Sequence, residues 1–370
     1  MFVHRSNRTE ELTLALADVV RAAPASVFTP EVIVVSSQGM ERWLAQELAT
    51  RLGVWANPSF PFPRAFVDQL LAEGAVTDGT VSAFTPGSLT WSIAELLPAI
   101  ARQPGAEALA SHLAGDEHAL TLFELSSQIA DVFDQYAVYR PELVQAWERG
   151  AGRGWQPDLF RAIVRRHGSS HLATRAARFL AAKVPPSAPA RVCVFGASAL
   201  PRIYVRLLAH LSSEREVHIF LLCPSSDRDT LHPMASSLGL LGRDFERLIL
   251  EEAPRAVFRD RFVEPGTRTA LTALQSDLFH GRKRTPRASD PSVAVHSCHG
   301  PMREVEVLRD QLLAMFEEDP TLEPHDVIVM APDIDEYAPL IDAAFGVSPA
   351  DAGFIPYRIA DQRVRTSDVV

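Results

Sequence analysis

Positive charge, cysteine and long apolar runs are all scarce in this sequence of 370 residues. Its 36 Lys and Arg residues are outnumbered by 46 Asp and Glu residues, which gives a formal net charge of -10. This balance argues against a general nucleic-acid-binding protein, because non-specific DNA binding depends on neutralising phosphates with basic side chains. It leaves room for a local basic channel. The three cysteines, Cys193, Cys223 and Cys298, are far apart and form no CxxC pair, which indicates reduced thiols and no metal site.

Membrane and export segments are also missing. No apolar stretch reaches the length of a membrane span, and the N-terminus lacks the apolar core of a signal peptide. We therefore expect a cytoplasmic protein with no membrane partner. The final residues, "IADQRVRTSDVV", carry no obvious helix cap or tail, and we expect the chain to be a piece of a longer one.

The first strand-to-helix loop lacks both glycine and lysine. Residues 2–3 are predicted to form a strand, "HRSNR" a loop, and Thr9 begins a helix. In a nucleotide-driven motor this loop is Gly-rich and ends in Lys-Ser/Thr, so that it cradles phosphates. Without glycine the backbone cannot easily wrap a phosphate, and no lysine is present to hold one. Arg5 and Arg8 could contact phosphate, but two solvated arginines beside a helix N-terminus are the favoured alternative.

A second motor element is absent from a later core strand. "RVCVFGAS" reads as a buried strand, and it ends in Phe195-Gly196-Ala197, where a motor carries an acidic residue for Mg²⁺. Both nucleotide elements are therefore missing together.

No Gly-x-Ser-x-Gly elbow surrounds Ser36 and Ser37. His296 and His299 flank Cys298 without a distal ligand pair, so we expect neither a catalytic residue nor a metal in this chain.

The segments that are present predict an α/β fold. Residues 1–53 read as strand, helix, strand and helix, and Gly53 fits the end of the second helix. Strand patterns disappear over residues 85–183, where helical patterns predominate, and return in "RVCVFGAS" and "EVHIFLLCP". "HGRKRTPRASDPS" has the composition of a linker. Beyond it, "SVAVHSCHG", a helix and "DVIVMAPD" predict a second β-α-β unit.

Two groups of polar residues could form a binding surface. Ser36, Gln38 and Arg42 follow a buried strand at its carboxyl end, where open α/β sheets place ligands. The long helix over residues 122–139 has a polar face that leads to Arg140. Gln, Asp and Arg can read base edges, although a solvated helix face is the simpler interpretation. Exposed aromatics in "NPSFPFPRAF" could stack on bases or merely cover the core.

Several stretches, in the same order along the whole chain, resemble the N-terminal part of the RecC family, the gamma subunits of exodeoxyribonuclease V (the RecBCD complex). They are "VHRSNR", "VIVVSSQGMERWL", "FPFPRAF", "LFELSSQIADVFDQYAVYRP", "VFGASALP" and "CHGPMREVEVLRDQLLAMFEEDPTLEPHDVIVMAPDIDEYAPLI". The resemblance implies a superfamily 1 helicase-like parallel sheet domain with decayed nucleotide motifs. It implies a 1A-like domain over residues 1–84 and 184–285, a 1B-like all-helical insertion over 85–183, and the start of a second, 2A-like α/β domain over 291–370.

The resemblance further implies a non-motor subunit in double-strand break repair by homologous recombination. Such a subunit splits duplex ends, channels single DNA strands and recognises the Chi hotspot, while ATP and Mg²⁺ are used by RecB-like and RecD-like partners of a heterotrimer. The family's DNA- and Chi-binding surface, carried over residue by residue, corresponds to Ser36, Gln38, Arg42, Phe62, Asp68, Asp131, Val132, Asp134, Gln135 and Arg140. Ser36, Gln38, Arg42 and Asp68 differ from the side chains expected there, so the sequence that is read could differ.

Two alternatives stay open. An AddB-type helicase/nuclease subunit would be supported by a P-loop and by the cysteines of an iron–sulfur cluster, and the sequence has neither. A small-molecule α/β enzyme would be supported by a Gly-rich turn after the first strand, which is also missing.

Overall fold

The computed structural model describes residues 1–22, 28–72, 83–114, 120–227, 232–283, 290–348, 350–351 and 353–360. Within them the fold is α/β, as the sequence predicts. The strands are β1 (Phe2–Ser6), β2 (Glu31–Val35), β3 (Pro58–Ser59), β4 (Arg191–Phe195), β5 (Glu216–Leu222) and β6 (Val257–Asp260). They form one parallel sheet with the order β3-β2-β4-β5-β1-β6.

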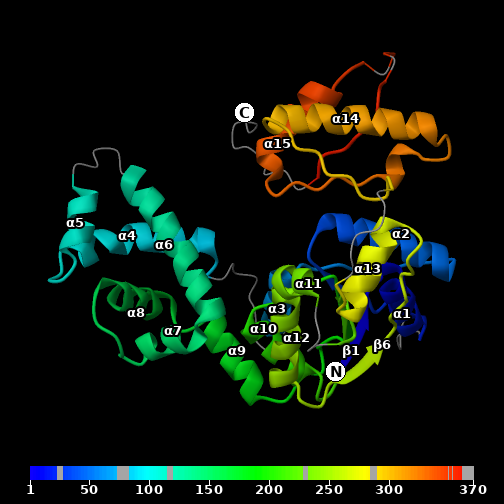
Figure 1. Ribbon diagram of the computed structural model, residues 1–370. Helices are drawn as coiled ribbons and strands as arrows, with labels where there is room; N and C mark the ends of the chain where they lie inside the picture. Colours follow the sequence, from blue (N-terminus) through cyan, green and yellow to red (C-terminus); the bar gives the residue numbers. More distant parts are fainter. Residues whose placement is uncertain are drawn as a thin grey trace. The chain divides into compact units, whose positions relative to one another are not determined.

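Helices connect the strands and follow them (Figure 1). Up to β4 these are α1 (Thr9–Arg21), α2 (Gln38–Leu52), α3 (Pro63–Ala72), α4 (Pro86–Ala101), α5 (Glu107–Leu113), α6 (Leu120–Tyr139), α7 (Pro141–Glu148), α8 (Trp155–His167) and α9 (Leu172–Ala181). After β4 come α10 (Arg202–Leu211), α11 (Pro233–Leu238), α12 (Leu240–Glu252), α13 (Ala270–His280), α14 (Pro301–Glu318), the 3-10 turn η1 (Pro324–Asp326) and α15 (Ile334–Phe345).

The central strands are buried on both faces. Every residue of β2 is buried, and β4 and β5 are buried except at their ends. A strand that alternates its side chains between two faces can be wholly buried only when both faces are covered. The β-branched run in "EVIVV" therefore indicates a central strand, and the structure confirms it. Gly53 follows α2 with φ 79° and donates its amide to the carbonyl of Ala49, as the predicted helix end requires.

The helices between β3 and β4 share an aromatic core. The rings of Phe133 on α6, Trp147 on α7 and Phe160 on α8 lie within 6.1 Å of one another and meet edge to face. Such pairs add stability beyond their buried area. The helix α4 packs against α6, and Thr85 caps its start by accepting a hydrogen bond from the amide of Ser88.

The chain divides into two compact units. The first contains residues Met1–Ser36, Trp43–Glu264 and Asp277–Lys283, and therefore the sheet. The second contains Ser37–Arg42, Pro265–Ser276 and Arg284–Val370, with α14 and α15 packed side by side. Residues 284–289 of the predicted linker lie outside the described residues. The domain boundaries given by the resemblance stay a prediction.

The predicted strands of the second unit are not formed. Residues 292–300 and 326–333 have no strand pairing. The structure instead uses Asp290 and Ser292 to accept hydrogen bonds from the amides of Ala270 and Leu271 at the start of α13. Val295 and Ile328 are 92% and 81% exposed. An apolar pattern alone does not make a strand, because its backbone groups need a neighbouring strand to pair with.

The sequence also failed to predict β3 and β6. The strand β3 has two residues and begins at Pro58, and β6 is a short edge strand with the sequence "VFRD". Neither has the apolar run of a buried strand. The helices α11, α12 and α13 likewise lie in a segment that was predicted only as polar and arginine-rich.

Two histidines on neighbouring strands form a buried pair. Nε2 of His4 on β1 lies 3.1 Å from Nδ1 of His218 on β5, and the rings are stacked with Phe2 and Phe220. Burial is the main cause that lowers the pKa of each histidine to about 4, and His218 lowers that of His4 further. The nearby charge of Arg259 acts in the same direction on both.

We expect the histidine pair to make the sheet acid-sensitive. The folded state holds both rings neutral, whereas the unfolded chain binds protons near pH 6.5, so stability is present above pH 6.5 and decreases as the pH falls towards 4. Because the two rings are coupled and titrate as a pair, the loss should be about 2–4 kcal/mol for the pair together. Amide exchange of β1 and β5 should therefore accelerate from pH 7 to pH 5 after correction for intrinsic rates. His218→Gln should make the exchange of these strands less dependent on pH. His112→Gln, at an exposed position, is the control and should leave the dependence unchanged. Equal exchange-against-pH curves for the two variants would contradict the role of the histidine pair.

Candidate functional site

The carboxyl end of β1 holds a buried arginine. Arg5 is 6% exposed. Its Nε and Nη2 donate to the two carboxylate oxygens of Asp260 at 2.9 and 2.7 Å, and its Nη1 donates to Glu246 at 2.7 Å. The rings of Phe258 and Phe262 lie 5.3 and 5.6 Å from the guanidinium carbon. Burial opposes the charge, but Asp260 and Glu246 outweigh it and raise the pKa of Arg5. Arg5 is thus a structural cation, not the solvated arginine favoured by the sequence.

The two residues after Arg5 close the loop against the segment that follows β6. The hydroxyl of Ser6 donates to the carbonyl of Arg261 at 2.6 Å. The side chain of Asn7 donates to the carbonyl of Val263 at 2.7 Å and accepts from its amide at 2.9 Å. The side chains of Arg5, Ser6 and Asn7 therefore all bind protein groups in the loop between β1 and α1. Glu10 and Glu11 in the first turn of α1 add negative charge there, which disfavours an anion.

The ends of β2 and β4 carry no acidic side chain. Gly196 directly follows β4 with φ 72°, a conformation that other residues rarely adopt. Ser36 directly follows β2 and is exposed. The hydroxyl of Ser37 accepts a hydrogen bond from the amide of Met40 at the start of α2. Neither strand end therefore presents a carboxylate to a ligand.

The helix α6 presents the polar face predicted from the sequence. Asp131 and Gln135 are exposed, whereas Ile129 and Phe133 are buried on the opposite face and Val132 is half-buried. The helix ends at Tyr139. Arg140 follows as an exposed side chain, and its amide still donates to the carbonyl of Tyr136. Rigid packing on one side therefore fixes the direction of the polar residues on the other.

Two of the predicted site residues meet at an arginine. Arg64 on α3 donates its Nε to Asp68 at 2.8 Å, and its Nη1 lies 2.9 Å from both carboxylate oxygens of Asp134 on α6. Arg175 on α9 donates to the other oxygen of Asp68 at 2.6 Å. We name Arg64, Asp68, Asp134 and Arg175 the arginine–aspartate cluster. Asp68 and Asp134, which the family resemblance assigns to DNA, are in this structure counter-ions of arginines.

Sequence reasoning missed both arginines of the cluster. The spacing Arg64-x-x-x-Asp68 is that of a helical ion pair and could have indicated the first. Nothing in the sequence places Arg175 or Asp134 beside it, because they are far apart along the chain. Tyr204 on α10 lies at the same place: burial raises its pKa to about 12, and the charge of Arg64 opposes this rise.

The other predicted residues lie apart from the cluster. Phe62 precedes α3 and is 41% exposed. Gln38 begins α2 and Arg42 lies one turn further along it; both are exposed and belong to the second unit. Their assignment to a DNA surface stays a prediction, as does that of Ser36, Val132 and the exposed residues of α6.

The described residues offer neither a metal centre nor a membrane-spanning helix. Among the residues that the structure describes, no group of three or more His, Cys, Asp and Glu could hold a metal ion. His296 and His299 are exposed, and Cys298 is half-buried between them in sequence. None of the described helices is both long and apolar enough to cross a bilayer.

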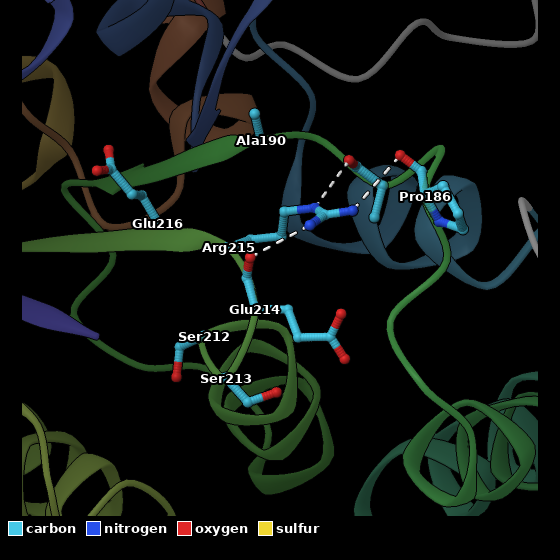
Figure 2. A pocket seen from close by; sticks show the side chains of 8 residues that line it. Pro186, Ala190, Ser212, Ser213, Glu214, Arg215 and Glu216 are labelled. Atoms are coloured by element: carbon cyan, nitrogen blue, oxygen red, sulfur yellow. Dashed lines mark hydrogen bonds between the residues drawn. The ribbon is translucent and has the colours of Figure 1, made fainter.

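A shallow pocket lies at the amino-terminal ends of β4 and β5, at the other end of the strands from Arg5 (Figure 2). Arg215 lies at its centre, and its guanidinium donates to the carbonyls of Ala188, Glu214, Pro185 and Pro186. These bonds occupy each of its three nitrogens. Four of the five N–H donors of the guanidinium are therefore used within the protein, and we assign the pocket no function.

Fold and loop together define a class: an α/β protein with a parallel sheet, in which the protein's own side chains close the loop after the first strand. The family model "RecC, N-terminal domain" matches residues 1–230. The chain therefore belongs to the RecC family.

Curated relatives agree with this assignment. The RecBCD enzyme subunit RecC of Escherichia coli (strain K12) is 33% identical over all of this chain and 40% of its own length. That of Haemophilus influenzae is 30% identical over all of this chain and 41% of its own. That of Mycolicibacterium smegmatis is 34% identical over 94% of this chain and 34% of its own. The chain thus spans about two fifths of the length of the first two relatives.

Removal of Arg5 should destabilise the first unit strongly. Its side chain and that of Glu246 are each 7% exposed, so Arg5→Met removes the cation that faces a buried carboxylate. We expect a loss of about 3–5 kcal/mol in the free energy of unfolding, part of which Glu246→Gln should restore in the double variant. Denaturant titration measures both. Arg21→Met, which breaks an exposed pair with Asp18, should change stability by less than about 0.5 kcal/mol. Equal losses for Arg5→Met and Arg21→Met would show that the network is not structural.

Proposed function

We propose that this chain forms the N-terminal part of a non-motor, DNA-handling subunit of a RecBCD-type helicase/nuclease, acting in double-strand break repair by homologous recombination. The subunit splits duplex ends, channels single strands and recognises a Chi-like hotspot, together with RecB-like and RecD-like subunits. The partners use ATP and Mg²⁺, and this chain is catalytically inactive. Membership of the RecC family supports the assignment, because the relatives are named as subunits of the RecBCD enzyme.

The closed loop after β1 is the observation that carries the non-motor role. We interpret the sheet as a helicase-like 1A domain with a decayed ATP site, and residues 85–183 as its 1B-like helical insertion. A phosphate bound at this loop would have to displace Arg5 from two carboxylates and Asn7 from the backbone of Val263. Because buried charges that lose their partners cost several kcal/mol, the loop favours its own contacts over a nucleotide. The 2A-like assignment of residues 291–370 remains a prediction.

The assembled complex should therefore bind no ATP on this subunit. Photolabelling with an azido analogue of ATP, followed by separation of the subunits, should label the partner motors and leave this one unlabelled. Labelling of the partners that excess ATP prevents provides the control. Specific, Mg²⁺-dependent labelling of this subunit would contradict a decayed site.

The polar face of α6 is the proposed surface for a single DNA strand. Asp131 and Gln135 point away from the buried face, and Arg140 follows at the end of the helix. A carboxylate repels phosphate, so Asp131 in a DNA channel is better suited to accept a hydrogen bond from a base amino group. Phosphate contacts position a strand, whereas these side chains would distinguish its bases.

Asp131→Ala and Arg140→Ala should weaken or alter the hotspot response in the assembled complex while unwinding continues. Loss of one base contact should cost about 1–3 kcal/mol in discrimination between bases. Product lengths on DNA with and without the cognate hotspot provide the measurement. Arg149→Ala, an exposed arginine after α7, is the matched control. If both test variants respond like the wild type, the polar face is only a solvated surface and the proposed site is wrong.

A further inference from the structure

The arginine–aspartate cluster has a geometry that is unusual for a simple surface ion pair. Arg64 and Arg175 come from different helices and donate to opposite oxygens of the same carboxylate, Asp68, at 2.8 and 2.6 Å. Two arginines around one small oxyanion is also how proteins recognise phosphate groups. Asp134 holds Arg64 from its other side, with both oxygens 2.9 Å from Nη1. Asp134 thus keeps Arg64 in place independently of Asp68, and Arg175 lies opposite it across the Asp68 carboxylate.

The cluster is accessible and has a spare donor. The side chains of Arg64, Arg175 and Asp68 are 34%, 20% and 37% exposed. Within the part of the chain that the structure describes, the buried Nε of Arg175 has no hydrogen-bond partner. A buried donor without a partner is unfavourable, so a further acceptor would be stabilising there.

The charges of the cluster favour a singly charged anion. Two arginines and two aspartates balance to zero while Asp68 stays in place. With Asp68 turned outwards, the arginines and Asp134 leave one positive charge, which a phosphodiester neutralises. Asp68 is the more exposed of the two carboxylates, at 37% against 20% for Asp134, and only Asp134 holds Arg64 against a different helix. Asp68 is therefore the group that can leave.

We propose that Arg64 and Arg175 bind one backbone phosphate of a single DNA strand, and that Asp68 occupies this position as an internal counter-ion when no strand is bound. Asp134 positions Arg64 and lies on α6 one turn from Asp131, so the phosphate would anchor a strand beside the base-reading face. Asp68 thereby lowers the affinity for all strands alike, because a phosphate contact carries no sequence information. The inference rests on the proposed function and specifies how its surface holds the backbone.

The test is the affinity of the assembled complex, without ATP, for a fluorescent oligo(dT) strand that contains no hotspot. Asp68→Asn keeps the shape of the side chain and removes its charge. We expect tighter binding by about two- to fivefold at low salt, the factor that corresponds to one half-exposed charge pair. Asp158→Asn is the matched control, because Asp158 pairs with Arg161 at 2.6 Å and is 40% exposed, yet lies on α8. It should leave the affinity unchanged.

The salt dependence identifies the phosphate contact. Adding Arg175→Gln to Asp68→Asn should abolish the gain and reduce the slope of log affinity against log salt by about 0.7, the value for one phosphate of a single strand. Inorganic phosphate should compete with oligo(dT) for this site. It should lower the extra affinity of Asp68→Asn only at concentrations at which it also displaces the oligo(dT) strand. If it binds the variant while oligo(dT) affinity stays at the wild-type value, the site is for a free anion and the proposal is wrong.

The remaining outcomes are equally decisive. Weaker binding by Asp68→Asn would show that Asp68 contacts DNA directly, and unchanged binding with a lower melting temperature would show that the cluster only joins helices; either overturns the proposal. Because oligo(dT) contains no hotspot, these outcomes do not depend on Asp131 and Arg140. Failure of the proposed function would instead appear as a wild-type complex that does not bind single strands.

Discussion

The buried guanidinium of Arg5 is the interaction on which the first unit depends most. It joins β1 to β6 through Asp260 and to α12 through Glu246, at the edge where parallel strands would bind a ligand. A cation inside a protein is tolerated only when it is paired and hydrogen-bonded, so Arg5 requires both carboxylates near it. The surrounding loop then closes through Ser6 and Asn7. The loop after β1 is in this way joined to the core of the first unit.

The arginine–aspartate cluster is a second ion network, among the helices of the same unit. There the side chains of Arg64 and Arg175 are 34% and 20% exposed, against 7% for Arg5, whereas the outer carboxylates Asp68 and Asp260 are about equally exposed. The difference in exposure separates a structural ion network from one that can exchange a partner. The same residue types thus close one surface and leave another available, and burial determines which of the two occurs.

Much of the fold could be predicted from local pattern. The runs in β2, β4 and β5 identify central strands, and the helical stripes identify α1, α2 and α6. The strands β3 and β6 could not be found this way, because short edge strands are formed by pairing and have little pattern of their own. The same dependence explains the error at residues 292–300 and 326–333, where apolar residues have no strand to pair with. At the site, the sequence alone showed that the loop after β1 lacks glycine and lysine. It could not predict that Asp260 and Glu246 pair with Arg5, because they lie some 240 residues away or more along the chain.

The central claim is that the loop after β1 is held by the protein's own side chains and not by a nucleotide. Hydrogen exchange of residues 4–11 in the assembled complex, with and without Mg²⁺-ATP, tests it most directly. The account predicts slow exchange in both conditions and no difference between them, while the nucleotide loops of the partner motors become protected. Slow exchange of this loop only in the presence of ATP would contradict it.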